Sequence, residues 1–205
     1  MPAWITFDWE TITGFRRHHL PHVTQAGAVY FITFRLGDSI PVSRVASWKS
    51  RMEQWRVSNP RPHNSTQREM LKAMGFRRVE KYLNGGDGSC LLRHTECRHI
   101  LAATLRHEDG RQYHLGDYVI MPNHVHVILK ALGSGDLSAI IGDWKSVSAH
   151  RINKLLQRKG SMWQDEWFDH IIRSPASLER VRQYIHDNPR RLPADSASIG
   201  CGAYK

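Results

Sequence analysis

Two strand-like segments joined by Pro122 and Asn123 constrain the fold of this chain more than any other feature. The segments YHLGDYVIM (113–121) and HVHVILK (124–130) are rich in β-branched and aromatic residues, which favour strands. Proline presets the first central position of a tight turn, and asparagine tolerates the second. The sequence therefore predicts a β-hairpin over residues 113–130.

The second strand of this hairpin begins with two histidines in an otherwise apolar run. Because successive strand residues point to opposite faces, we expect His124 and His126 to share one face, with Asn123 and Val125 on the other. Imidazole is the commonest metal ligand in proteins, so the pair is a candidate metal site. The alternative is a partly exposed pair on a solvated sheet face, since the chain has 13 histidines.

Patterns elsewhere in the chain predict an α+β protein with a single domain over residues 1–205. We expect further strands at 28–36 and 168–173, and helices at 41–57, 67–83, 94–107, 137–157 and 175–188. The first three helices form a helical insertion at about 41–107, and a flexible tail covers about 190–205. The predicted core is an antiparallel sheet of four or five strands, with helices mainly on one face and the histidines on a middle strand. The helix at 137–157 is expected to bury Leu137, Ile141, Trp144, Ser148, Ile152 and Leu155.

The last predicted helix carries a second candidate group. Ser174 is expected to cap it, and Pro175 occupies its first position. Tyr184 and Asn188 are spaced i and i+4, so they lie on one helical face. Asn188 could offer a carbonyl oxygen to a metal held by the histidines, with Tyr184 one turn away as a nucleophile. The alternative is a half-buried tyrosine followed by a helix-capping asparagine.

Charge indicates the class of partner. Lys plus Arg number 29 against 19 Asp plus Glu, a net charge of +10, which favours polyanions such as nucleic acid. The candidate DNA-binding residues lie before the first strand, on the long helix and after the last helix, and each could equally be a solvated charge; they are Arg16, Arg17, Arg151, Lys154, Arg158, Arg190 and Arg191.

The cysteines and the N-terminus indicate the compartment. The three cysteines lack metal or disulfide spacing, and the N-terminus lacks the pattern of a signal peptide. We expect a soluble cytoplasmic, nucleoid-associated protein without membrane partners.

Two motifs together resemble a known family. MPNHVHVIL and, far downstream, YIHDNP resemble the IS200/IS605-like single-tyrosine transposases, and within them the REP-associated tyrosine transposases. YFITFRL and WQDEWFDHIIRSPASLERVRQYIHDNP extend the resemblance from Leu20 to Pro189. It implies a ferredoxin-like fold with a His-hydrophobic-His motif on the sheet. It also implies that Tyr184 is the nucleophile and that His124, His126 and Asn188 hold a metal.

The activity implied by the resemblance is metal-dependent cleavage and transfer of single-stranded DNA at hairpin (REP-like) repeats, through a 5′-phosphotyrosine intermediate. The implied cofactor is Mg²⁺, with Mn²⁺ as substitute, and no nucleotide cofactor is expected. We expect a monomer, with a homodimer as the alternative.

Two other readings stay open from the sequence. The chain could be a non-catalytic regulator that binds DNA hairpins and retains the transposase fold. An unrelated metallohydrolase would want carboxylates near the histidines, and the hairpin offers only Asp117. A two-histidine phosphoesterase would need a second His-x-Ser/Thr motif in a matching strand, and none of the expected strands contains one.

Overall fold

The computed structural model describes residues 12–17, 21–25, 27–60, 64–72, 78–133, 136–193 and 196–202. They form two compact units: residues 38–90 make one, and the described residues on either side of them make the other. Within these ranges, no helix is long and apolar enough to cross a membrane.

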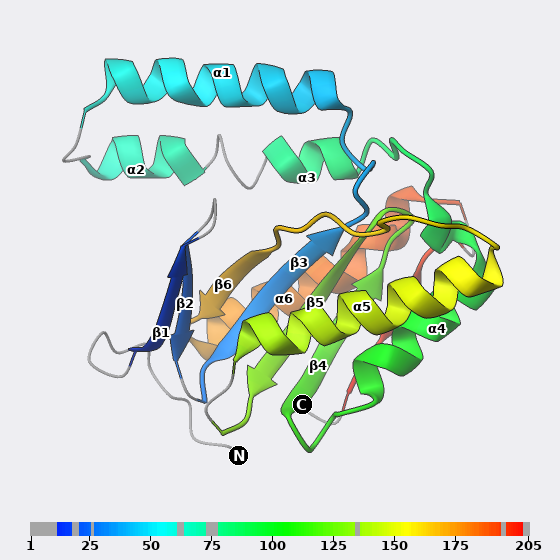
Figure 1. Cartoon of the computed structure of the whole chain (residues 1–205). Helices are drawn as coiled ribbons and strands as arrows, with labels where there is room; N and C mark the ends of the chain where they lie inside the picture. Colours follow the sequence, from blue (N-terminus) through cyan, green and yellow to red (C-terminus); the bar gives the residue numbers. More distant parts are fainter. Residues whose placement is uncertain are drawn as a thin grey trace. The chain divides into compact units, whose positions relative to one another are not determined.

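A five-stranded sheet organises the larger unit, with strand order β6-β3-β5-β4-β7 and antiparallel pairing throughout (Figure 1). The strands are β3 (Val29–Arg35), β4 (Tyr113–Ile120), β5 (His124–Ala131), β6 (Phe168–Ile172) and β7 (Ser198–Gly200). The prediction of an antiparallel α+β sheet with the histidines on a middle strand is confirmed, because β5 is the central strand.

The β4–β5 hairpin closes as the sequence predicts. The Met121 amide donates to the His124 carbonyl at 2.9 Å, with Pro122 and Asn123 between them. In β4 the register shifts between Leu115 and Tyr118, which is a β-bulge.

Helices cover both faces of the sheet unequally. Figure 1 shows α4 (Thr95–Arg106) and α5 (Leu137–Leu155) in front of the strands and α6 (Pro175–Asp187) behind them. The face under α4 and α5 holds the main core, which includes Val125, Val127, Leu101 and Trp144. The Trp144 indole nitrogen donates to the Tyr113 hydroxyl at 2.9 Å, so the polar atom of this core indole is paired. We call the opposite face of the sheet, under α6, the histidine face.

The structure corrects two details of the expected helix stripe and tail. Leu155 is 46% exposed rather than buried, because the stripe passes from Ile152 to Leu156, which packs against the core. The tail was expected to lack regular structure, yet Ser198–Gly200 forms the edge strand β7 beside β4.

A separate two-stranded hairpin was not predicted at all. It consists of β1 (Ile12–Arg17) and β2 (Pro21–Gln25), paired antiparallel. Its strands lack the clear apolar alternation that identifies the central hairpin.

The smaller unit contains α1 (Val42–Ser58), α2 (Ser65–Lys72) and α3 (Arg78–Leu83). The helix expected over 67–83 is thus described as two segments, with residues 73–77 outside the description. Arg44 and Asp87 form an ion pair of 2.7 Å within this unit. The third helix of the expected insertion, α4, belongs instead to the larger unit, since its Leu101 and Leu105 lie in the main core.

Candidate active site

His124 and His126 lie side by side on the histidine face and are both fully buried. Their Nε2 atoms are 3.1 Å apart, and their ring centroids are 4.7 Å apart. The shared face predicted from strand alternation is therefore confirmed. The alternative of a solvated histidine pair is wrong, because α6 and the neighbouring strands exclude water from both rings.

Burial makes both imidazoles weak bases. It lowers the pKa of His124 to about 3. Burial and, secondarily, the neighbouring His124 lower the pKa of His126 well below its usual value. Both rings are therefore neutral near pH 7, and a neutral imidazole carries the lone pair that a metal needs.

The outer nitrogens of the two rings contact oxygen atoms. Thr33 Oγ1 lies 2.8 Å from His126 Nδ1, because Thr33 is the cross-strand partner of His126 in the β3–β5 register. Asn123 Oδ1 lies 2.8 Å from His124 Nδ1. The prediction that Asn123 faces away from the histidines is wrong, since it lies in the turn, where strand alternation does not hold.

Tyr184 approaches the pair from α6 of the same chain. Its hydroxyl is 3.4 Å from His126 Nε2, and its ring meets Phe31 edge-on at 5.9 Å. The predicted start of this helix is confirmed, because the Ser174 hydroxyl accepts from the Ser177 amide and Pro175 follows the cap. The side chain of Tyr184 is half-buried.

Asn188 caps α6 one turn after Tyr184, and its amide nitrogen is buried without a hydrogen-bond partner. The two ends of an amide have the same shape, so a half-turn would place Oδ1 at this position. A buried oxygen without a donor is the group that a bound cation would satisfy. No third His, Cys, Asp or Glu joins the pair in the described part of the chain, so an amide oxygen fits as the further ligand.

Asp117 ties α6 to the sheet and was not among the predicted site residues. Its carboxylate lies 3.2 Å from His186 Nε2 and 3.7 Å from Arg182 Nε. Leu115 and Tyr118 both lie in the main core, because a β-bulge separates them. The same bulge leaves the side chain of Asp117 directed at α6. No short sequence pattern announces such a bulge.

The predicted DNA-binding residues do not gather at the histidines. Arg151 and Lys154 are exposed on α5, which packs on the opposite face of the sheet, and Arg158 is exposed just after that helix. Arg190 is exposed and pairs with Asp187 at 2.9 Å. The side chains of the remaining three residues lie outside the description; they are Arg16, Arg17 and Arg191.

One half-buried cation that the prediction omitted lies on the strand next to the histidines. Arg35 is the strand partner of His124, but its guanidinium donates to the Leu36 carbonyl at 3.4 Å and lies near enough to Lys145 to help lower the pKa of that lysine. Burial lowers the pKa of its guanidinium from the usual value, which still leaves it charged at neutral pH.

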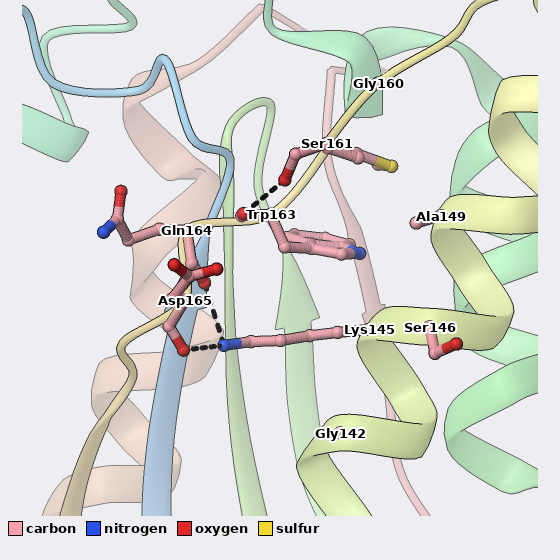
Figure 2. Close-up of a pocket in the computed structure, with 10 residues that line it drawn as sticks. Gly142, Lys145, Ser146, Ala149, Gly160, Ser161, Trp163, Gln164 and Asp165 are labelled. Carbon is pink, nitrogen blue, oxygen red and sulfur yellow. Dashed lines mark hydrogen bonds between the residues drawn. The ribbon is translucent and has the colours of Figure 1, made fainter. Parts of the chain in front are cut away.

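A shallow depression of about 370 Å³ lies elsewhere, between α5 and residues 160–165 (Figure 2). The Lys145 ammonium donates to the carbonyls of Gln164 and Asp165, each at 2.9 Å. Burial lowers the pKa of Lys145 to about 8. Because its ammonium already bonds two carbonyls, Lys145 fastens this segment to α5 and is not a candidate catalytic group.

Two buried imidazoles and a tyrosine hydroxyl thus lie together on one face of an antiparallel sheet in an α+β protein, and a buried amide follows the tyrosine by one helical turn. Residues 93–188 match the family described as "Transposase IS200 like". That range contains the hairpin, α5 and the helix of Tyr184 up to Asn188. This stretch, a little under half of the chain, is thus similar to the IS200-like transposases, in agreement with the resemblance found in the sequence.

A similar solved structure is described as "Structure of the REP associates tyrosine transposase bound to a REP hairpin". It shares 17% identity with this chain, with a TM-score of 0.45, and the similarity covers 87% of this chain and 73% of that chain. No curated protein matches this chain.

Proposed function

We propose that the protein is a metal-dependent endonuclease and strand transferase for single-stranded DNA, with Tyr184 as nucleophile. The observation that carries this proposal is the position of the Tyr184 hydroxyl, 3.4 Å from Nε2 of the buried His126 of its own chain. The contacts of Asp117 with Arg182 and His186 hold α6 on the sheet, and so keep Tyr184 beside the two buried imidazoles. Such support is expected for a tyrosine that reacts at this position.

His124, His126 and Asn188 would hold the cation. We propose Mg²⁺, with Mn²⁺ as substitute; such an ion polarises a phosphate and stabilises a departing oxygen. Two neutral imidazoles and one amide oxygen leave positions for phosphate oxygens, and imidazole ligands suit Mn²⁺ well.

The chain's own groups perform the remaining tasks. Tyr184 Oη forms a bond to phosphorus while the bond from phosphorus to the 3′ oxygen breaks. The tyrosine loses its proton, the 3′ oxygen gains one, and the DNA 5′ end stays on the protein. Arg35, the strand partner of His124, would supply positive charge for the phosphate.

The substrate that the motifs favour is DNA with hairpin (REP-like) repeats. Because Tyr184 reaches the histidines of its own chain, one copy suffices for a complete site, and we propose that the protein acts as a monomer. Three exposed cations remote from the site of cleavage would attract the DNA backbone; they are Arg151 and Lys154 on α5 and Arg158 just after it.

Trapping of a covalent protein–DNA adduct tests this function. The protein is incubated with Mg²⁺, Mn²⁺ or EDTA and single-stranded hairpin oligonucleotides, and then separated on denaturing gels. We expect an adduct that requires the ion, disappears in Tyr184→Phe and persists in the matched control Tyr82→Phe. Hairpin binding without any adduct would instead support a non-catalytic DNA-binding regulator.

A further inference from the structure

A buried arginine on α4 forms a cluster of hydrogen bonds that the proposed mechanism does not use. Arg98 is only 3% exposed. Its Nη1 donates to the carbonyls of Leu92 and Arg93, at 3.1 and 2.6 Å. Its Nη2 donates to Thr95 Oγ1 at 3.1 Å, and its Nε donates to Ser198 Oγ at 2.8 Å. A buried charge is costly unless its donors are paired, so these bonds fix the guanidinium in one position.

Two of the acceptors belong to a short helix, η3 (Leu91–Arg93), which directly precedes α4. Within it Leu92 is fully buried, and its amide donates to the Pro122 carbonyl at 3.1 Å. Pro122 lies in the turn that leads into β5. Arg98 therefore holds one side of that turn through η3.

The same turn leads directly to the buried histidine pair. From β3, the Leu36 amide donates to the Asn123 carbonyl at 2.9 Å and holds the other side of the turn. The side chain of Asn123 contacts the next residue, with Oδ1 2.8 Å from His124 Nδ1. A shift of the turn would therefore shift the His124 ring. A misplacement of about 1 Å at a catalytic group can cost about 100-fold in rate.

The C-terminal strand joins the cluster through Ser198. In β7 this residue lies opposite Ile120 of β4, at the edge of the sheet. Gly200 lies so close to Tyr118 that a Cβ at that position would overlap the tyrosine ring. This close fit places the Ser198 hydroxyl where it accepts from Arg98.

We infer that Arg98 is a positioning residue, which fixes the turn before His124 by holding η3, with Ser198 of β7 as its further partner. This inference rests on the proposed function, because it concerns the site that contains His124. Arginine suits the role because its planar fork reaches acceptors on η3, α4 and β7 at once, whereas lysine carries all its donors on one nitrogen.

Amide hydrogen exchange tests the hold of Arg98 on η3 without any need for catalysis. The wild type is compared with Arg98→Met, which keeps a long side chain without donors, and with Arg93→Met, which removes an exposed arginine of the same segment. Relative to the Ile128 amide of β5, we expect the Leu92 amide to exchange at least about 10-fold faster in Arg98→Met alone. The same relative rate in all three proteins would overturn the inference.

The rate of adduct formation tests the consequence for the site. At saturating hairpin DNA, and at a temperature where every variant is folded, we expect Arg98→Met to form the adduct about 10–100-fold more slowly than wild type, with unchanged hairpin affinity. Ser198→Ala removes one contact and should slow the reaction less, and Ser198→Thr keeps the hydroxyl and should restore the wild-type rate. A merely structural role would lower stability and leave the rate of the folded protein unchanged. The wild-type rate in Arg98→Met would therefore overturn the inference.

The two proposals fail in different ways. If the wild type forms no adduct, the proposed function is overturned, and the inference with it, whatever the exchange rate of the Leu92 amide. If the wild type forms the adduct and Arg98→Met forms it equally fast, only the role of Arg98 is overturned. If Arg98→Met does not fold, the serine variants decide, and equal rates in Ser198→Ala and Ser198→Thr would overturn the inference.

Discussion

Acidification should destabilise this protein through its two buried imidazoles. In the folded chain both rings are neutral and excluded from water, and burial lowers the pKa of His124 to about 3. In the unfolded chain a histidine has a pKa near 6.5. As the pH falls below about 6.5, the unfolded state therefore binds a proton that the folded state does not accept.

The sign and size of the effect follow from proton linkage. A state that binds more protons is favoured by acid, so the free energy of unfolding decreases as the pH falls, with the effect of His124 ending near pH 3. For one such group the slope is about 1.4 kcal/mol per pH unit, so a drop from pH 6.5 to pH 5 costs about 2 kcal/mol. His126, whose pKa lies well below its usual value for the same reason, adds a loss of the same sign. A typical domain has only about 5–15 kcal/mol of stability to lose.

Urea unfolding between pH 7.5 and pH 5 measures this loss. It is done in EDTA, because a bound cation would add its own dependence on pH. The wild type is compared with a double variant, His124→Gln with His126→Gln, and with His150→Gln, which removes an exposed histidine from α5. Acidic side chains contribute equally to all three proteins, so the difference in slope isolates the buried pair.

We expect the wild type and His150→Gln to lose at least about 2 kcal/mol more than the double variant between pH 6.5 and pH 5. Parallel slopes in all three proteins would refute the reasoning, because they would mean that the folded protein protonates these rings as readily as the unfolded chain does.

Three further predictions follow from individual contacts. A mixture of Tyr184→Phe protein and His126→Ala protein should form no DNA adduct, because Tyr184 lies beside the histidines of its own chain. An adduct in the mixture would show that two copies exchange α6. Asp117→Asn should lower the free energy of unfolding by about 1 kcal/mol or less, because the partners of Asp117 are partly exposed. It should still reduce adduct formation strongly, because it loosens α6 from β4. An unchanged adduct yield would contradict a positioning role of Asp117. Leu101→Ala should lower the free energy of unfolding, measured in urea, by about 2–5 kcal/mol, because it leaves a cavity in the main core. A loss below about 1 kcal/mol would mean that neighbouring core side chains move in and fill the cavity.

The parts of the site that depend on local periodicity could be predicted from the sequence. Strand alternation places His124 and His126 together, and helical spacing places Asn188 one turn after Tyr184. Both patterns act within a few residues, so a single sequence contains them.

The contacts between distant elements could not be predicted in the same way. Thr33 meets His126 only because of the register between β3 and β5, which no local pattern specifies. Asp117 reaches α6 only because of the bulge in β4. The edge strand β7 is three residues long, too short for any alternation to emerge from the sequence.

The arrangement of charge explains how a protein with a net charge of +10 could hold a cation beside DNA-binding chemistry. Asp117 of β4 lies within 4 Å of both Arg182 and His186 of α6, so it offsets positive charge on the helix that carries Tyr184. The exposed cations of α5 lie on the opposite face of the sheet, with the apolar core between them and the histidines. Repulsion between like charges falls with distance and with intervening solvent ions. In the proposed function, neutral imidazoles would offer a cation its ligands without competing protons, while the remote basic surface would attract the phosphate backbone. Charge reversal on α5 should accordingly change DNA affinity and its dependence on salt, and leave the affinity for the ion unchanged.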